Sequence, residues 1–149
     1  MHPWRIVLML AALAGGCGGG VAQSDIPTSP SSPLGPALLG TTWTAIEIDG
    51  QAVDASEQQR RPNILLSSDG NRVTGSTGCN RISGTFTQDG AMLRFGALAT
   101  TRIACVPDRS ATENAFNAAM EATASHAIAN QTLELLDAAG VVRMRLRAN

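Results

Sequence analysis

The fold is decided by residues 70–86, which read GNRVTGSTGCNRISGTF, and by residues 99–105, which read ATTRIAC. Asp-Gly pairs at 69–70 and 89–90 flank the first stretch. Such pairs are typical of hairpin turns, because Asp tolerates left-handed backbone conformations and Gly adopts them without steric cost. Apolar runs alternate with these turns, so the sequence predicts a meander of strands at residues 63–67, 71–76, 82–87 and 91–96.

A helix is predicted to follow this meander at residues 110–124. Ser110-Ala111-Thr112-Glu113 has the form of a capping box, in which the Ser and Glu side chains satisfy each other's backbone N–H groups. Phe116, Ala119 and Met120 follow at helical spacing and form one apolar stripe. We therefore expect this helix to pack on the sheet.

Further strands are predicted on either side of this region. Residues 42–48 form one strand, and residues 132–136 and 141–147 form a hairpin joined by a turn that ends at Gly140. The last strand alternates strictly between apolar residues and arginines, in the order Val142, Arg143, Met144, Arg145, Leu146, Arg147. This alternation predicts one face in the core and one in water.

Composition limits the classes of function. The chain has 149 residues, 44% of them apolar, which suits one modest domain with attachments. Its 11 basic residues are all arginine and leave a net charge of -1, whereas nucleic-acid binding calls for a clustered positive excess. Aromatic residues make up only 3%, so stacking platforms for bases are largely missing. We expect a monomer that does not bind nucleic acid.

The N-terminal residues have the parts of an export signal. Residues 1–16 combine a short basic start, an apolar run of about nine residues and small residues before Cys17. This ending resembles the bacterial lipobox, which implies a lipid such as palmitate on Cys17, and Gly18 resembles the pattern of outer-membrane sorting. The alternative is ordinary secretion with a free Cys17. Residues 17–36 are rich in Pro, Gly and Ser and are predicted to form a tether.

Two cysteines remain once Cys17 is assigned to lipid. Cys79 and Cys105 would face an oxidising periplasm, where disulfides persist, so we expect them to be bonded to each other. The alternative is a pair of buried reduced thiols. A metal site is disfavoured, because neither cysteine belongs to a CxxC pair and His126 is the only histidine after the signal segment.

These residues resemble the META/HslJ family of small bacterial envelope proteins. The resemblance rests on the GCN element at 78–80, on Gly84, on residues 98–105 and on Glu113 with Phe116, and it covers the domain at 37–149. It implies an α+β fold in which a strongly curved, mainly antiparallel, partly open barrel-like sheet carries one helix. It also implies links to heat shock, envelope stress and antibiotic tolerance, with no defined enzymatic activity.

An enzymatic role is not expected, and no cofactor or metal is expected either. A nucleophilic site needs a base beside the nucleophile, and we interpret His126 as a residue at the C-terminus of the helix, where the dipole favours it. Carboxylates are harder to dismiss, because a hydrolase could use a converging pair from among four: Asp69, Asp89, Glu113 and Glu134.

Two groups of residues are candidates for ligand or partner contact. Asn80 either caps a tight turn or displays its amide together with Arg81. Arg143, Arg145 and Arg147 form either an ordinary solvated face or a stripe that contacts lipopolysaccharide phosphates or an acidic protein. The expected function is therefore that of a non-catalytic lipoprotein on the periplasmic face of the outer membrane, which binds another envelope component.

Two alternatives belong to other classes of function. One is a periplasmic inhibitor of a hydrolase such as lysozyme, which would need a loop that enters a cleft. The other is a binder of small hydrophobic ligands, with a pocket inside the curved sheet lined by residues such as Trp43 and Ile64.

Overall fold

A computed structural model of the chain describes residues 35–54 and 60–149. The predicted signal segment, Cys17 and the tether up to residue 34 lie outside the described residues. Within the described ranges, no helix is both long and apolar enough to cross a bilayer.

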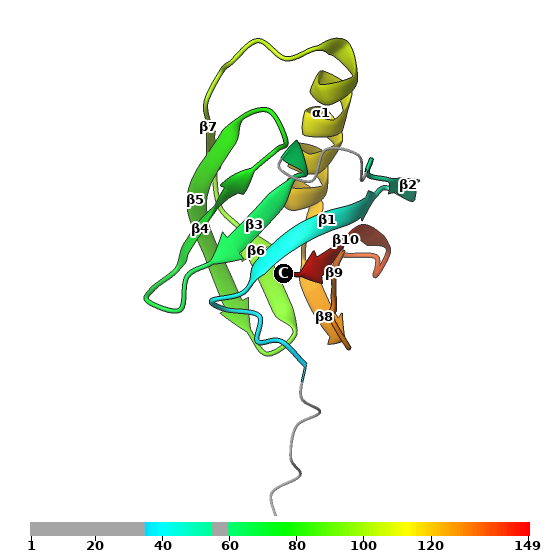
Figure 1. Cartoon of the computed structure of the whole chain (residues 1–149). Coiled ribbons are helices and arrows are strands. Elements are labelled where there is room, and N and C mark those ends of the chain that lie inside the picture. Colours follow the sequence, from blue (N-terminus) through cyan, green and yellow to red (C-terminus); the bar gives the residue numbers. More distant parts are fainter. Residues whose placement is uncertain (1–34, 55–59) are drawn as a thin grey trace, which may run out of the picture. The chain divides into compact units, whose positions relative to one another are not determined.

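An antiparallel sheet dominates the fold, with one helix in the described chain (Figure 1). This confirms the predicted α+β class. The elements are β1 (Thr42–Ile48), β2 (Gln51–Ala52), β3 (Asn63–Leu66), β4 (Arg72–Ser76), β5 (Arg81–Asp89), β6 (Met92–Phe95), β7 (Ala99–Thr100), α1 (Pro107–Ala122), β8 (Ser125–Ala129), β9 (Thr132–Leu136) and β10 (Val142–Ala148).

The sheet closes into a ring. Strands follow the order β10-β9-β8-β6-β5-β4-β3-β1, and β1 pairs again with β10 from Trp43↔Ala148 to Ile48↔Met144. This agrees with the predicted strongly curved, barrel-like sheet. β2 lies beside β1, and β7 pairs with β5 beyond the end of β6.

One joint of the ring is much shorter than the others. β6 and β8 share only the pair Met92↔Ser125, supported by backbone hydrogen bonds from Leu93 N to Ala124 O and from His126 N to Ala91 O.

Elsewhere the strands approach closely, and Gly75 on β4 shows how closely. A Cβ at Gly75 would lie 2.0 Å from the carbonyl oxygen of Asn63, so at this one position the approach of β3 and β4 requires glycine.

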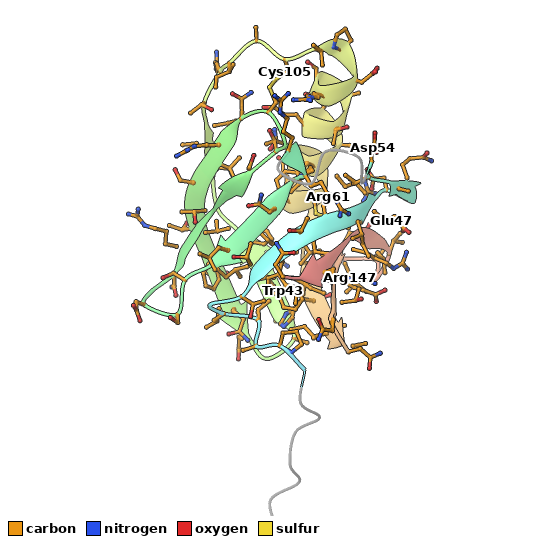
Figure 2. The ribbon with its side chains drawn as sticks, in the orientation of Figure 1. Trp43, Glu47, Asp54, Arg61, Cys105 and Arg147 are labelled. Atoms are coloured by element: carbon orange, nitrogen blue, oxygen red, sulfur yellow. A yellow bond between two sulfur atoms is a disulfide. The ribbon has the colours of Figure 1, made fainter. Side chains whose placement is uncertain are left out.

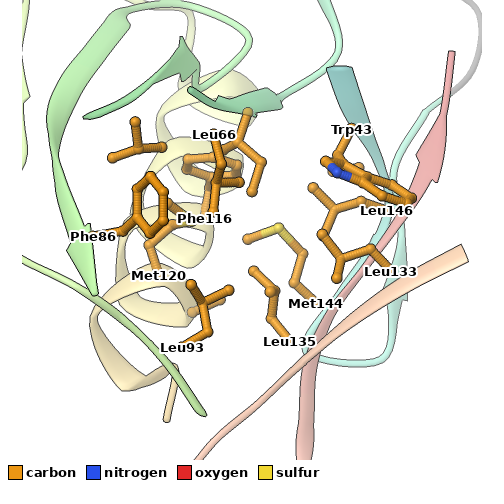
Figure 3. Close-up of a cluster of buried hydrophobic side chains, with 14 of the residues drawn as sticks. Trp43, Leu66, Phe86, Leu93, Phe116, Met120, Leu133, Leu135, Met144 and Leu146 are labelled. Atoms are coloured by element: carbon orange, nitrogen blue, oxygen red, sulfur yellow. The ribbon is translucent and has the colours of Figure 1, made fainter. Parts of the chain in front are cut away.

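The core fills the ring. Trp43, Ile64, Leu93, Leu135 and Leu146 are wholly buried, and Figure 3 shows several of these side chains converging with those of the helix. The indole Nε1 of Trp43 donates to the carbonyl of Leu38 at 3.0 Å, which satisfies its one polar group. The interior pocket that the small-ligand hypothesis placed at Trp43 and Ile64 is therefore occupied by core.

The helix inserts its predicted apolar stripe into this core. Phe116, Ala119 and Met120 are wholly buried. Because every buried apolar side chain of the described chain lies between residues 38 and 146, this part of the protein contains a complete core of its own, as an autonomous domain requires.

Both predicted ends of the helix were wrong. α1 begins at Pro107, which follows the N-cap Val106, and proline suits the first helical turn because its fixed φ matches a helix and its missing N–H needs no partner. Ser110 therefore lies inside the helix, and its hydroxyl donates to the carbonyl of Val106 at 3.4 Å. The capping box does not form, which leaves the Glu113 carboxylate available elsewhere.

His126 also lies outside the helix, contrary to the prediction. The helix ends before Thr123, and His126 belongs to β8, where it pairs with Leu135 of β9. Its Nδ1 lies 3.1 Å from the carbonyl oxygen of Ala91. Burial lowers the pKa of this imidazole, and the contact with Ala91 raises it by less.

Candidate functional site

The site is built on a tight turn between β4 and β5. Thr77 N donates to the carbonyl of Asn80 at 2.8 Å, and Asn80 N donates back to the Thr77 hydroxyl at 2.9 Å. Gly78 stands at the corner with φ +92°, and a Cβ there would lie 2.6 Å from the carbonyl oxygen of Arg60. The position therefore requires glycine both for its backbone angle and for its neighbour.

A disulfide joins this turn to the loop before the helix. Cys79 and Cys105 are bonded, with their Cα atoms 6.1 Å apart across 26 positions of sequence. Figure 2 shows Cys105 at the end of the domain where the loop meets α1. The bond thus fixes residues 101–106, which we call the braced loop.

Asn80 makes a second connection to the braced loop and to the helix. Its Oδ1 accepts hydrogen bonds from the Ile103 backbone N–H at 2.7 Å and from the Thr101 hydroxyl at 2.9 Å. Its Nδ2 donates to the two carboxylate oxygens of Glu113 at 3.2 and 3.0 Å. Only 4% of Asn80 is exposed, so its amide does not face outward as the ligand-contact hypothesis required.

We call Cys79, Asn80, Cys105 and Glu113 the Asn80 node. Both sulfurs and a Glu113 oxygen lie within 4.8 Å of one another, a spacing that metal ligands can have. The sulfurs are bonded to each other, however, and metals bind thiolates. In this state the node connects a turn, a loop and a helix.

The arginines of β10 behave differently from one another. Arg145 donates from Nε to Glu134 at 2.8 Å and from Nη1 to Glu47, and these contacts raise the pKa of the guanidinium, with the hydrogen bond to Glu134 as the largest cause. Arg143 pairs through Nε with Asp49 at 2.8 Å. Arg143 and Arg145 are half-buried, whereas Arg147 is exposed. The stripe is therefore largely neutralised by carboxylates.

Arg81 is exposed, by contrast, and lies beside the braced loop. Its backbone N–H donates to the Thr101 hydroxyl at 3.0 Å, and its carbonyl accepts from Thr101 N at 3.1 Å. The next residue, Arg102, is exposed as well. Of the predicted contact residues, Asn80 and Arg81 thus lie together at the braced loop, while the β10 arginines belong to another surface.

The braced loop also exposes two large aliphatic side chains that the sequence analysis did not single out. Ile103 is 64% exposed and Val106 is 60% exposed. Together with Arg81 they line a shallow surface hollow of about 690 Å³ beside the disulfide. In the sequence, the feature that could have pointed to these side chains was an apolar residue in a short irregular segment near a bonded cysteine.

A second hollow, of about 500 Å³, lies between α1 and the segment around β7. Phe95 and Leu98 line one side and pack partly on the core, while Asn117 and Glu121 line the helix side. It differs from the pocket expected inside the sheet, because it lies on the surface of the domain.

Comparison with known proteins identifies this architecture. The family model of the META domain matches residues 36–149. The chain belongs to the META domain family. No functionally curated protein matches it.

Solved structures share the fold of this META domain. An NMR structure of a protein from Burkholderia xenovorans is 23% identical, with a TM-score of 0.62, over 83% of this chain and 99% of that one. The crystal structure of a DUF4847 family protein from Bacteroides vulgatus is 16% identical, with a TM-score of 0.56, over 75% of this chain and 94% of the other. In the first case the match spans almost the whole neighbouring chain.

Proposed function

We propose that this protein is a lipid-anchored META domain that binds another envelope component without catalysis and thereby supports the cell under heat or envelope stress and in antibiotic tolerance. One observation carries the proposal. The braced loop is fixed by the disulfide and by Asn80, and yet it presents Ile103 and Val106 outward. Exposed apolar groups on a preorganised loop favour binding, because little conformational entropy is lost when a partner arrives.

A binding role also agrees with how the reactive residues are used. The sulfurs of Cys79 and Cys105 are bonded to each other, and Glu113 accepts from Asn80. His126 lies on β8, while the braced loop meets the far end of α1 (Figure 1). The 16-residue helix between them is about 24 Å long, so the imidazole cannot act as a base for groups at the braced loop.

The location follows from the N-terminal sequence. Residues 1–16 would direct export, and acylation at Cys17 would hold the mature protein at the outer membrane on its periplasmic face. More than one acyl chain gives stable anchoring, whereas one chain gives only marginal binding.

The anchor is tested by replacing its attachment point. Wild-type protein and Cys17→Ser are produced in the native host, and mass spectrometry and membrane fractionation are compared. We expect acyl chains on the wild-type N-terminal peptide and outer-membrane recovery, both of which the variant loses. An unacylated wild-type protein in the soluble fraction would overturn the anchoring proposal.

The physiological role is tested in a deletion strain exposed to heat and to antibiotics. We expect sensitivity that wild-type protein restores and Cys17→Ser does not. A lysozyme assay with the purified domain separates the alternative, because an inhibitor would slow lysis at stoichiometric concentration. Inhibition of that kind, or a deletion strain that survives like its parent, would contradict the proposed role.

A further inference from the structure

The exposed end of the braced loop combines apolar and cationic side chains. Ile103 and Val106 are exposed at 64% and 60%, and Arg81 and Arg102 beside them are exposed as well. We call these four residues the Ile103 tip. The backbone bonds between Arg81 and Thr101 place the first arginine next to the chain that carries the second.

The charge of the tip is positive. Arg109 also lines the hollow beside Val106, but Asp108 is its neighbour in the first turn of α1 and is exposed there. The opposite charges of Arg109 and Asp108 offset each other. The net positive charge therefore comes from Arg81 and Arg102, on the side of Ile103. Anionic groups are therefore the complementary partners of this surface.

We propose that the Ile103 tip docks on a membrane surface rich in anionic phospholipid. The two aliphatic side chains enter the boundary between headgroups and acyl chains, where burial of apolar area favours binding. The two guanidinium groups contact lipid phosphates, for which their planar fork of donors is suited. The binding partner is thus an apolar layer covered by phosphate groups. A soluble anion offers the charge without the apolar layer.

The Asn80 node gives the tip its shape. Oδ1 of Asn80 holds the Ile103 backbone N–H at 2.7 Å, and the disulfide holds Cys105 between Ile103 and Val106. These connections hold the backbone that carries both aliphatic side chains. The loop meets the membrane already ordered, so binding does not require it to become ordered.

The chain enters the domain far from the tip. The segment before β1 lies at the end opposite the braced loop (Figure 1). Fully extended, a segment as long as residues 18–34 reaches at most roughly 60 Å. An anchored domain can thus turn its tip to the membrane. The inference deepens the proposed function by naming the envelope component, and it does not depend on the acyl chains.

The test uses the domain at residues 36–149, which has its own core, purified from an oxidising compartment. Its co-sedimentation is measured with vesicles of phosphatidylcholine alone and of phosphatidylcholine with phosphatidylglycerol. We expect binding to the anionic vesicles only. Ile103→Ser with Val106→Ser should lower the partition coefficient at least about tenfold, and Arg81→Gln or Arg102→Gln should lower it about fivefold each.

Matched variants are available on other surfaces. Met92 and Val141 are each 54% exposed, and Arg72 and Arg94 are exposed arginines on β4 and β6. Met92→Ser with Val141→Ser, and Arg72→Gln with Arg94→Gln, should leave vesicle binding unchanged. Inorganic phosphate at vesicle phosphate concentration should not compete.

Several outcomes would overturn the inference. Equal binding to neutral vesicles, equal losses in tip and control variants, or competition by free phosphate would each do so. Absence of vesicle binding by a folded domain, verified by circular dichroism, would also do so. That failure would leave acylation at Cys17 and the stress phenotype unaffected, so it is distinguishable from failure of the proposed function.

Discussion

Two polar regions join distant parts of this domain, and they differ in how much water reaches them. In the Asn80 node the central amide of Asn80 is buried, its partners Cys79, Cys105 and Glu113 are partly buried, and a covalent bond joins the two cysteines. The second region, which we call the arginine ladder, joins Glu47 of β1, Arg145 of β10 and Glu134 of β9 through side chains about one third exposed. Burial determines how much each region contributes to the free energy of unfolding. A polar group removed from a buried site leaves its partners without hydrogen bonds, whereas water replaces a partner that is lost at the surface.

The disulfide of the node should have the largest effect. Replacing both Cys79 and Cys105 by Ala releases a loop across 26 positions, which on the chain-entropy model lowers the free energy of unfolding by about 3–4 kcal/mol. Denaturant unfolding of the domain measures this difference. Wild-type protein with a reductant should unfold like the double variant, and equal midpoints with and without reductant would show that the bond does not matter.

Asn80 comes next. Asn80→Ala leaves the Ile103 N–H and the Glu113 carboxylate without their partner, at a cost of about 2–3 kcal/mol in the free energy of unfolding. Asn80→Asp should be worse still at neutral pH, because it places a second carboxylate against Glu113. The comparison is made by denaturant unfolding near pH 7. An Asp variant as stable as wild type would contradict the assigned hydrogen bonds.

The arginine ladder should matter less. Arg145→Gln removes both of its ion pairs, and we expect the midpoint of thermal unfolding to fall by no more than about 4 °C. Raising the salt concentration should reduce this difference, since exposed charges are screened. A larger loss that persists in high salt would place the ladder among the buried networks and remove the contrast with the node.

His126 should give the smallest effect, and it has a definite sign. Burial lowers its pKa in the folded domain below the ordinary value of 6.5, so the unfolded chain binds the proton more tightly. The contribution of neutral His126 to stability is therefore complete above about pH 6.5 and is lost as the pH falls through the lowered folded pKa. Unfolding measured at several pH values should show this slope in wild type and not in His126→Gln.

The sequence predicted the strands better than the site, for a physical reason. Turn signals and alternation are local, so β1 was predicted with its observed ends and β10 within one residue. The partners of Arg145 are set by strand register, which places Glu47 and Glu134 on either side of it. The sequence of β10 by itself does not indicate that the neighbours of Arg145 on the two adjacent strands are acidic.

Glu113 shows how a local rule can lose to a stronger one. Ser110 and Glu113 fit a capping box, but Pro107 starts the helix earlier, since the first turn suits proline. Glu113 then points to Asn80, which is 33 positions away. β8 was missed for a related reason: its sequence SHAIA has little β-branched or aromatic character, and pairing with β9 gives it strand geometry.

The pairing of β1 with β10 has a consequence for how the protein is made. The first strand of the ring must wait for a partner that ends at residue 148. The hydrogen-bonded ring therefore cannot close until β10 has been synthesised, whereas the hairpins formed by β3, β4 and β5 can pair earlier. Closure of the ring is thus a late step in the folding of this domain, because it joins strands that lie at the two ends of the described chain.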